Sequence, residues 1–383
     1  MRVPHTPGIA PIQQLSPSVY EALLRCKARA AWVAHGDRSA VPLHPKALLG
    51  TCLHSVVEEA HKGRLAELDE EARLAAAREI FDRRAKALYE QSHPLVRAKW
   101  SSPEMLPYYN LYRERAALEA IASASRVERI APATDASRPA NSPRLYAEKK
   151  LVSIDGLLVG RPDLIDSVAQ EIIDYKTGVA PDEAEGAASA AEVRQLRLYV
   201  HLAFENGVPV SRATVARADG HRASIDVSKE DADGEGRTAR ELLAQYNSTV
   251  GGAFDESAQP SPENCGFCPC IPFCEAFWRT ASPAWAEQCG VHLEGTISSV
   301  DESTVQGMKL TTLRVEVQRG TVGSGDTFVE QVPDAWITAD GADAPRQGDA
   351  VRVVNGKLEG EAPPQVIRVN RTATSVWTFA AER

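Results

Sequence analysis

The chain has 383 residues, of which 43% are hydrophobic, and its formal net charge is −9. This length allows two or three domains with buried cores, and the negative charge excludes a protein that coats nucleic acid, although a nuclease needs basic residues only along one groove. No segment reaches the roughly 18 apolar residues that a membrane span requires, and residues 1–16 lack the features of a secretory signal. We therefore expect a cytoplasmic protein without a membrane partner.

The first third of the chain is predicted to be helical. Ser16 is suited to cap a helix with Pro17 in its first turn, and the helical pattern continues to about residue 63. Residues 64–92 form a charged, alanine-rich amphipathic stretch, and residues 108–127 form a further helical run. We interpret the region of about 64–130 as a helical insertion in a domain that spans residues 1–285.

The middle of the chain predicts short strands around one long helix. A loop rich in Pro, Ala and Ser covers residues 131–143, and a second soft linker covers residues 179–190. The predicted strands are 144–154, 156–166, 170–175, 211–217 and 222–227, with a helix at 191–206. Helices beside a central group of strands indicate a mixed α/β core.

The last part of the chain changes to alternating strands separated by glycine-rich turns. Strands are predicted at 292–297, 310–317, 335–338, 350–354, 365–369 and 375–379. So many short strands in residues 290–383 predict a separate, small all-β domain. A closed, OB-like barrel is the first interpretation and a β-sandwich is the second.

Two carboxylates and a lysine in the predicted central strands are candidates for metal-dependent phosphodiester chemistry. Asp163 lies eleven residues before Asp174, and Lys176 follows Asp174 by two residues. Carboxylate oxygens suit Mg²⁺ or Mn²⁺, which are hard cations. Because strand side chains alternate, Lys176 would project from the same face as Asp174, where it could orient the attacking water. An isolated Asp-x-Lys pair is better explained as a surface pair at the end of a strand.

Further polar pairs flank these residues in the sequence. Gln195 and Tyr199 are four residues apart on the predicted helix and share one face, as do His54 and Glu58 farther upstream. Each pair alone is typical of an ordinary helix surface. His54, Glu148, Asp163, Asp174-Tyr175-Lys176, Gln195 and Tyr199 taken in this order resemble the PD-(D/E)XK nuclease superfamily, specifically its RecB-like branch, over roughly residues 15–280.

The resemblance implies a fold, an activity and a role for each residue. The fold would be a restriction-endonuclease-like α/β core, in which helices flank a central mixed sheet, and the activity would be Mg²⁺- or Mn²⁺-dependent hydrolysis of DNA, on single strands or at DNA ends. The implied metal ligands are His54, Asp163, Asp174 and the carbonyl of Tyr175. Lys176 would be the catalytic lysine, Gln195 and Tyr199 would contact the site and the DNA backbone, and Glu148 would have a supportive role. Many relatives carry Glu where this chain has Asp174, and we expect activity to survive that change.

The seven cysteines predict a second metal centre. Cys265, Cys268 and Cys274 are clustered, and Cys26 could supply a fourth thiolate from far away in the sequence. Four thiolates suit a 4Fe-4S cluster, and a structural zinc is the alternative. The arrangement resembles iron-sulfur nucleases of AddAB-type helicase-nucleases and of CRISPR adaptation modules, and this resemblance favours an iron-sulfur clasp between the N-terminal helices and the segment that leaves the core.

The other cysteines and the DNA-contacting residues are less sharply predicted. Cys270 is an alternative cluster ligand, whereas Cys52 and Cys289 are expected to be ordinary buried thiols. The candidate phosphate contacts are Arg25, Lys27, Arg29, Arg161, Arg194 and Arg197. The candidate base-stacking aromatics, although such residues are more often part of a core, are Phe328, Trp336 and Trp377.

Two functional hypotheses remain at this point. The first is a DNA nuclease, and the second is a nucleic-acid-binding scaffold subunit whose nuclease-like core is weak or inactive. The intact ligand set favours the nuclease. Because the sequence contains no G-x-x-x-x-G-K-[S/T] phosphate loop, any unwinding would come from a separate helicase or other protein partner.

Overall fold

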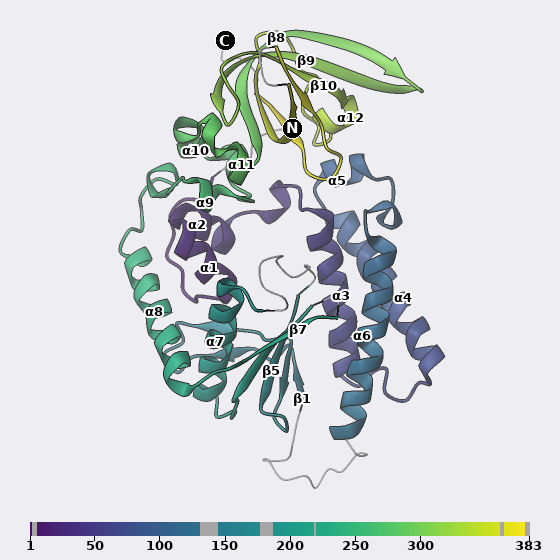
Figure 1. Ribbon diagram of the computed structural model, residues 1–383, viewed down its shortest axis with the longest axis vertical. Helices are drawn as coiled ribbons and strands as arrows, with labels where there is room; N and C mark the ends of the chain where they lie inside the picture. The colour runs from purple at the N-terminus through teal and green to yellow at the C-terminus, as the bar shows by residue number, and fades with distance from the viewer. Residues whose placement is uncertain (2–5, 131–144, 177–186, 218–219, 361–363, 380–383) are drawn as a thin grey trace.

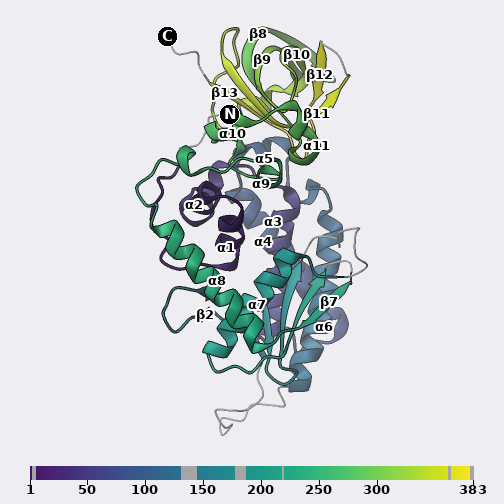
Figure 2. The same cartoon turned by 60° about the vertical axis from the view of Figure 1, so that its left-hand side comes forward.

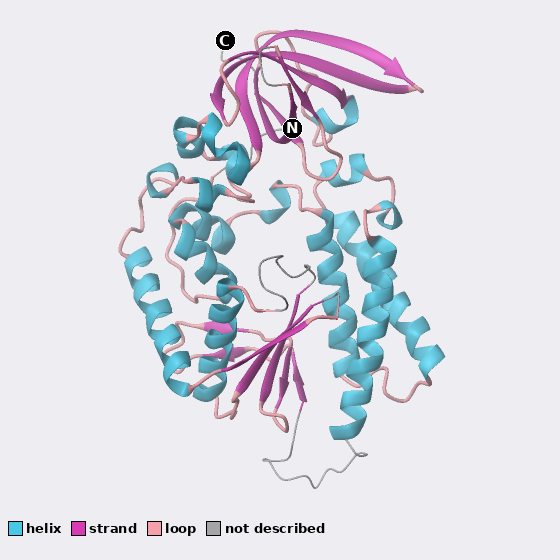
Figure 3. Cartoon of the chain, viewed as in Figure 1, coloured by secondary structure: helices cyan, strands magenta, loops and turns pink. Residues whose placement is uncertain are grey.

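The computed structural model describes residues 1, 6–130, 145–176, 187–217, 220–360 and 364–379, and for residues 125–130 it describes the backbone alone. An α/β body occupies one end of the long axis and a β-barrel occupies the other (Figure 1). Figure 3 shows that the helices lie mainly in the body and the longest strands in the barrel. The predicted 131–143 loop and most of the 179–190 linker lie outside the described residues.

The body is built on a five-stranded sheet with the order β1-β4-β5-β6-β7. Its strands are β1 (Leu145–Ala147), β4 (Leu164–Asp166), β5 (Glu171–Lys176), β6 (Arg212–Arg217) and β7 (Arg222–Asp226). Strands β5 and β6 are parallel and the other neighbours are antiparallel. The sheet is therefore mixed, which confirms the predicted α/β core. A small separate hairpin pairs β2 (Leu151–Val152) with β3 (Val159–Gly160).

Helices cover both faces of this sheet (Figures 1 and 2). On one face lie α1 (Pro17–Arg25), α2 (Lys27–His35), α7 (Ala190–Glu205) and α8 (Lys229–Asn247); on the other lie α3 (Pro45–His61), α4 (Glu70–Gln91), α5 (Pro94–Lys99) and α6 (Tyr109–Ile130). Because strand side chains alternate, Ile172 of β5 packs in the first core and Ile173 in the second. Because both faces of the sheet are covered, four consecutive residues of β5, 172–175, are buried.

The helices that carry candidate residues begin where the sequence provides caps. The Ser16 hydroxyl accepts a hydrogen bond from the Val19 N–H, and Pro17 occupies the first turn of α1, as predicted. Helix α7 begins with a capping box in which Ser189 and Glu192 each accept the other's backbone N–H. These caps fix the ends of the two helices nearest the candidate site.

The predicted strands 144–154 and 156–166 are each broken in two. The first is broken at Glu148, whose φ of 49° takes the backbone out of the extended conformation, and the second is broken at residues 161–163, between β3 and β4. Gly156, with a φ of 74°, lies in the turn between β2 and β3. The Glu148 N–H donates to the carbonyl of Asp163 at 3.1 Å, which places the two residues side by side. The strand predictions missed this bend because Glu gives no sequence signal for a left-handed backbone.

The C-terminal part forms a six-stranded sheet with the order β12-β10-β9-β8-β11-β13. Its strands are β8 (Val291–Val305), β9 (Met308–Gly320), β10 (Gly325–Pro333), β11 (Ala350–Glu359), β12 (Gln365–Arg368) and β13 (Ser375–Phe379). Strand β11 also pairs with β12, so β8 to β12 close into a barrel, and β10 and β12 are parallel.

One strand prediction in the barrel is wrong. Residues 335–338 were expected to be extended, but Asp334–Ile337 form the short helix α12, and strand β10 before it was not predicted. Pro333 ends β10 and precedes the helix, whose first residue, Asp334, accepts a hydrogen bond from Thr311. A bulge between Val329 and Val332 breaks the alternation that would have revealed β10.

Short helical turns connect the body with the barrel. In the segment between α8 and β8 they are η3 (Asp255–Ser257), α9 (Pro262–Cys265), η4 (Ile271–Phe273), α10 (Glu275–Thr280), η5 (Pro283–Trp285) and α11 (Ala286–Cys289); earlier ones are η1 (Arg38–Ala40) and η2 (Pro103–Met105). Arg352 of the barrel donates to the carbonyl of Pro272 at 2.9 Å and to Glu294 at 2.7 Å. Lys99 of α5 donates to the carbonyl of Thr374 at 2.6 Å, so the connecting segment and the second helical layer both contact the barrel.

Among the described residues, the search for a helix with the length and apolar character of a membrane span finds none.

Candidate active site

The two predicted carboxylates lie together at the end of a β-hairpin. In the β4–β5 pair Leu164 is opposite Ile173, so Asp163 and Asp174 face each other one step further along. The Oδ2 atom of Asp163 accepts the backbone N–H of Tyr175 at 2.6 Å. The structure thus brings together the two carboxylates that are eleven residues apart in sequence.

His54 and Glu148 approach Asp163 from other elements. His54 projects from α3, and its Nδ1 lies 3.1 Å from Oδ1 of Asp163. One possible ligand atom each from His54, Glu148 and Asp163 lie within 4.8 Å of one another. The structure therefore groups Glu148 with the predicted metal ligands, whereas the sequence assigned it only a supportive role. This position of Glu148 depends on its left-handed backbone, which the sequence does not reveal.

The pKa values of these carboxyls reflect burial and the crowding of negative charge. Burial, together with the neighbouring charge of Asp163, raises the pKa of Glu148 to about 7. Burial likewise raises the pKa of Asp174 to about 6. Burial also opposes ionisation of Asp163, but the hydrogen bonds from His54 and Tyr175 and the nearby positive charges together outweigh it and lower that pKa. A bound cation favours the ionised forms of all such carboxyls, so this donor set fits a divalent metal.

Gln195 forms hydrogen bonds with three other predicted side chains of the site. Its Nε2 donates to Oδ1 of Asp174 at 2.9 Å and to the Tyr199 hydroxyl at 3.1 Å, while its Oε1 accepts from Nζ of Lys176 at 2.8 Å. The i, i+4 spacing on α7 places Gln195 and Tyr199 on one face, as predicted. Burial raises the pKa of Tyr199, so its hydroxyl stays neutral and can donate.

Asp174 is oriented differently from the other carboxylates. It is not in the group of His54, Glu148 and Asp163, because its carboxylate contacts Gln195 and Lys176. Nζ of Lys176 lies 2.8 Å from Oδ2 of Asp174, yet within the described part of the chain this buried oxygen accepts no hydrogen bond of acceptable geometry. An oxygen that is buried and incompletely satisfied is a suitable ligand for a cation.

An open groove lies beside this site. Lys176, Gln195 and Tyr199 line it together with Lys150, Arg161 and the first residues of α1. The other two predicted phosphate contacts near Gln195 are engaged elsewhere, since Arg194 donates to Glu21 at 2.7 Å and Arg197 lies 3.8 Å from Asp231. Lys150 was not identified from the sequence. It directly precedes β2, and the β2–β3 hairpin brings it to the groove.

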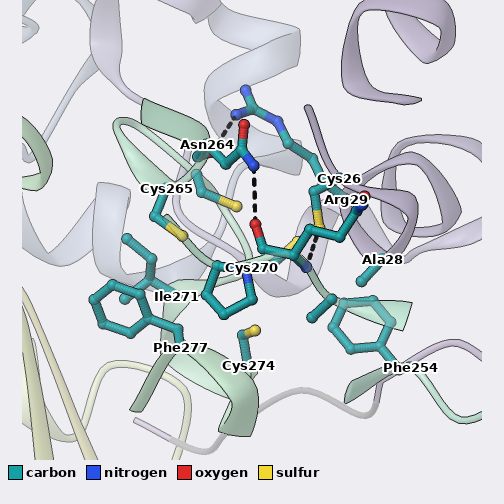
Figure 4. A pocket seen from close by; sticks show the side chains of 14 residues that line it. Cys26, Ala28, Arg29, Phe254, Asn264, Cys265, Cys270, Ile271, Cys274 and Phe277 are labelled. Carbon is teal, nitrogen blue, oxygen red and sulfur yellow. Dashed lines mark hydrogen bonds between the residues drawn. The ribbon is translucent and has the colours of Figure 1, made fainter. Parts of the chain in front are cut away.

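The cysteines line a second, smaller cavity. Its walls include the four predicted cluster ligands and the alternative ligand: Cys26, Cys265, Cys268, Cys270 and Cys274. Figure 4 shows Cys26, Cys265, Cys270 and Cys274 around this cavity, next to Phe254 and Phe277. Cys26 lies between α1 and α2, and the others lie in the α9–α10 segment. The structure therefore joins thiols from the two ends of the body.

All seven cysteines are free thiols. Burial raises the pKa of Cys265 and Cys274 to about 12, and a hydrogen bond shared with Cys270 lowers the pKa of Cys268 to about 7. Among the described residues, no three sulfur atoms lie within 4.8 Å of one another. Cys52 and Cys289 lie outside the cavity and hydrogen-bond to backbone carbonyls, as ordinary buried thiols do.

The barrel aromatics are not equivalent. Trp377 is fully buried and its indole N–H donates to Ser375, so it is a core residue and not a stacking platform. Trp336 lies beside Nζ of Lys99 at the contact with α5, and Phe328 lies beside the guanidinium of Arg314. Both are half-buried.

The chain was compared with known proteins. The model of the PD-(D/E)XK nuclease superfamily matches residues 14–275, which is well over half of the chain. A solved structure described as "Crystal structure of SSO0001" is similar with 14% sequence identity and a TM-score of 0.23, and the match covers 44% of this chain and 79% of that one. Among curated proteins none matches.

Proposed function

Since the chain belongs to the PD-(D/E)XK nuclease superfamily, we propose that it is a metal-dependent DNA nuclease that hydrolyses phosphodiester bonds in single strands or at DNA ends. The observation that carries this proposal is the arrangement of Asp174, Lys176 and Gln195 between a carboxylate cluster and an open groove. A scaffold without chemistry would not need a buried carboxylate with a raised pKa beside a lysine.

The residues that would hold Mg²⁺ or Mn²⁺ are His54, Asp163, Asp174 and the carbonyl of Tyr175, and we add Glu148 to them on the basis of its position. A divalent ion bound there supplies an activated water and offsets the negative charge that develops on phosphorus. The protein supplies the fixed carboxylate positions, which are set by the β4–β5 pairing and by the hydrogen bond from Tyr175 to Asp163.

Lys176 would orient the attacking water and stabilise the developing charge. Its ammonium is held by Oε1 of Gln195 and by Asp174, and it lines the groove, where a phosphate would enter. The neutral hydroxyl of Tyr199 fixes the other side of the Gln195 amide. Positioning and electrostatic stabilisation are therefore the contributions of these three side chains.

The test is a cleavage assay on end-labelled linear and on circular DNA, single- and double-stranded, with Mg²⁺, Mn²⁺ or a chelator. We expect cleavage with either ion and loss of about 10²-fold or more of the rate in Asp174→Asn, on the scale of removing one electrostatic group from an active site. The folded state should be no less stable in Asp174→Asn, because burial penalises the carboxylate charge.

Asp226→Asn is the matched control, because that aspartate is highly exposed and distant from the site. Equal activity of wild type and Asp174→Asn would refute the site assignment. If the wild type binds DNA but cleaves none of these substrates with either ion, the scaffold hypothesis replaces the nuclease.

We also propose that the cysteine cavity holds a 4Fe-4S cluster that acts as a clasp. The cavity brings together Cys26 and three thiols of the α9–α10 segment, and four thiolates are what such a cluster needs. A structural zinc bound by four thiolates is the alternative. Cys270 lines the same cavity as the four proposed ligands and remains the alternative to one of them.

The barrel supports the interpretation as an OB-like domain, because five of its strands close and the β10–β12 pair is parallel. Half-buried Phe328 is the remaining stacking candidate on a strand. Because the sequence has no phosphate loop, we propose that a separate helicase or other protein provides the substrate strand.

A further inference from the structure

The groove beside the active site contains two cations that have no partner in the described structure. Lys150 and Arg161 are both exposed, and among the described residues neither side chain forms an ion pair or a hydrogen bond. Glu21, the acidic residue that lines the groove, is already held by a two-point contact with Arg194, at 2.7 and 2.9 Å. The groove wall therefore carries uncompensated positive charge in a chain whose net charge is −9.

The hairpin register places the two cations opposite each other. Leu151 pairs with Gly160 in the antiparallel β2–β3 hairpin, so Lys150 and Arg161 face one another at the next position. Like charges directly across two strands repel and destabilise the pair. An anion between them converts this repulsion into two attractive contacts, and a phosphate, which accepts from both Arg and Lys, is the anion that fits.

The position of this pair relates it to the reaction. Lys150 and Arg161 line the same groove as Lys176, Gln195 and Tyr199, and the Tyr199 hydroxyl contacts the carbonyl of Arg161 at 3.4 Å. A strand whose scissile phosphate lies at Lys176 would therefore place a neighbouring phosphate near the cations. The contact is to the backbone and carries no sequence information.

We propose that Lys150 and Arg161 form a binding site for a non-scissile phosphate of the DNA strand. This inference rests on the proposed nuclease function. The two cations would contribute to substrate binding independently of the metal site. Because they contact the backbone, the enzyme should bind its substrate without regard to base sequence.

The test measures binding of a fluorescein-labelled oligothymidine by anisotropy in the presence of a chelator, over salt concentrations from about 50 to 200 mM. Wild type is compared with Lys150→Ala, Arg161→Ala and the double variant. We expect the double variant to bind at least about tenfold more weakly and to lose about 0.7 from the slope of log K against log salt, which is the value for one phosphate of a single strand. In cleavage assays its KM should rise while kcat stays within about twofold, because uniform binding is lost.

Lys86→Ala and Arg237→Ala are matched controls, because both residues are exposed, and neither lines the groove or has an ion pair within the described structure. DNA-free Lys150→Ala should unfold at the same or higher denaturant concentration than wild type, because it relieves repulsion. Binding and salt slope equal to those of the controls would overturn the proposal.

The two proposals fail separately. If the double variant loses binding but wild type never cleaves DNA, the phosphate site stands and the nuclease function falls. If wild type cleaves DNA and the double variant binds and cleaves like the controls, the nuclease stands and this site falls.

Discussion

At the scale of single residues, Gln195 is the side chain through which the candidate site is organised. The Nε2 group of its amide donates to Asp174 and Tyr199, and the amide oxygen accepts from Lys176. A carboxylate in its place could not donate to Asp174, and an apolar side chain could hold neither partner. We therefore propose that Gln195 positions the lysine and the carboxylate that would act on substrate.

Replacing Gln195 tests this role. We expect Gln195→Ala and Gln195→Glu each to lower kcat by about 10- to 100-fold, on the scale of losing an outer hydrogen-bond partner of a metal site, with a smaller effect on KM. Steady-state kinetics with Mg²⁺ would check this. Gln245→Ala, an exposed residue on α8, is the control and should behave as wild type. Full activity of Gln195→Glu would contradict the positioning role, since that variant keeps the size of the side chain and loses only its donor.

At the scale of elements, the close contact between the β2–β3 hairpin and α7 holds this arrangement in place. A Cβ atom at Gly160 would lie 2.7 Å from Cδ1 of Leu202 and 2.9 Å from Cδ1 of Tyr199. The hairpin can approach α7 closely only because this residue has no side chain. The position of the Tyr199 hydroxyl, and through it that of Gln195, depends on this approach.

Gly160→Ala should therefore damage both stability and activity. Overpacking of this kind costs typically about 1–3 kcal/mol of unfolding free energy, and displacement of the Tyr199 ring should lower kcat as well. Urea unfolding and cleavage kinetics on one preparation would measure both. Gly234→Ala is the matched control, because it lies in α8 with Arg237 as its nearest neighbour at 3.8 Å, and it should be stabilising by about 0.5–1 kcal/mol. A Gly160→Ala protein as stable and active as wild type would show that the contact is not needed.

The same elements show which parts of the structure could be predicted from sequence. Helix α7, the β4–β5 hairpin and the pairing of Asp163 with Asp174 follow from local patterns, so they could be predicted. The left-handed Glu148 and the groove position of Lys150 depend on how the chain bends between short strands, which composition does not encode. Strand β10 was missed for a similar reason, because its bulge removes the alternating pattern.

At the scale of the whole molecule, the cysteine cavity lies between the α/β body and the barrel. Cys26 ends α1 and precedes α2, while Cys265 and Cys274 belong to the segment that leads from α8 to the barrel (Figure 2). The first turn of α1 lines the groove, and its last residue adjoins Cys26. One short helix, of about 14 Å at 1.5 Å per residue, therefore connects the two proposed sites.

The metal content of the cavity decides the nature of the clasp. Protein purified without oxygen should be brown and contain iron and sulfide, and Cys26→Ser should lose most of the iron and unfold at a lower temperature. Metal analysis, absorbance and thermal unfolding would check this. Cys52→Ala is the matched control, because its thiol lies outside the cavity, and it should retain the iron. Colourless protein with stoichiometric zinc would replace the cluster by a structural zinc.

The order of these thiols along the chain has a consequence for how the protein is made. Cys26 leaves the ribosome 239 residues before Cys265, so the proposed cluster could be inserted only after the whole α/β body had been synthesised. By analogy with a disulfide, a link that closes a loop of this length would lower the conformational entropy of the unfolded chain and raise the free energy of unfolding by about 5 kcal/mol. Loading of the proposed cluster would thus be a late step that stabilises the newly made protein.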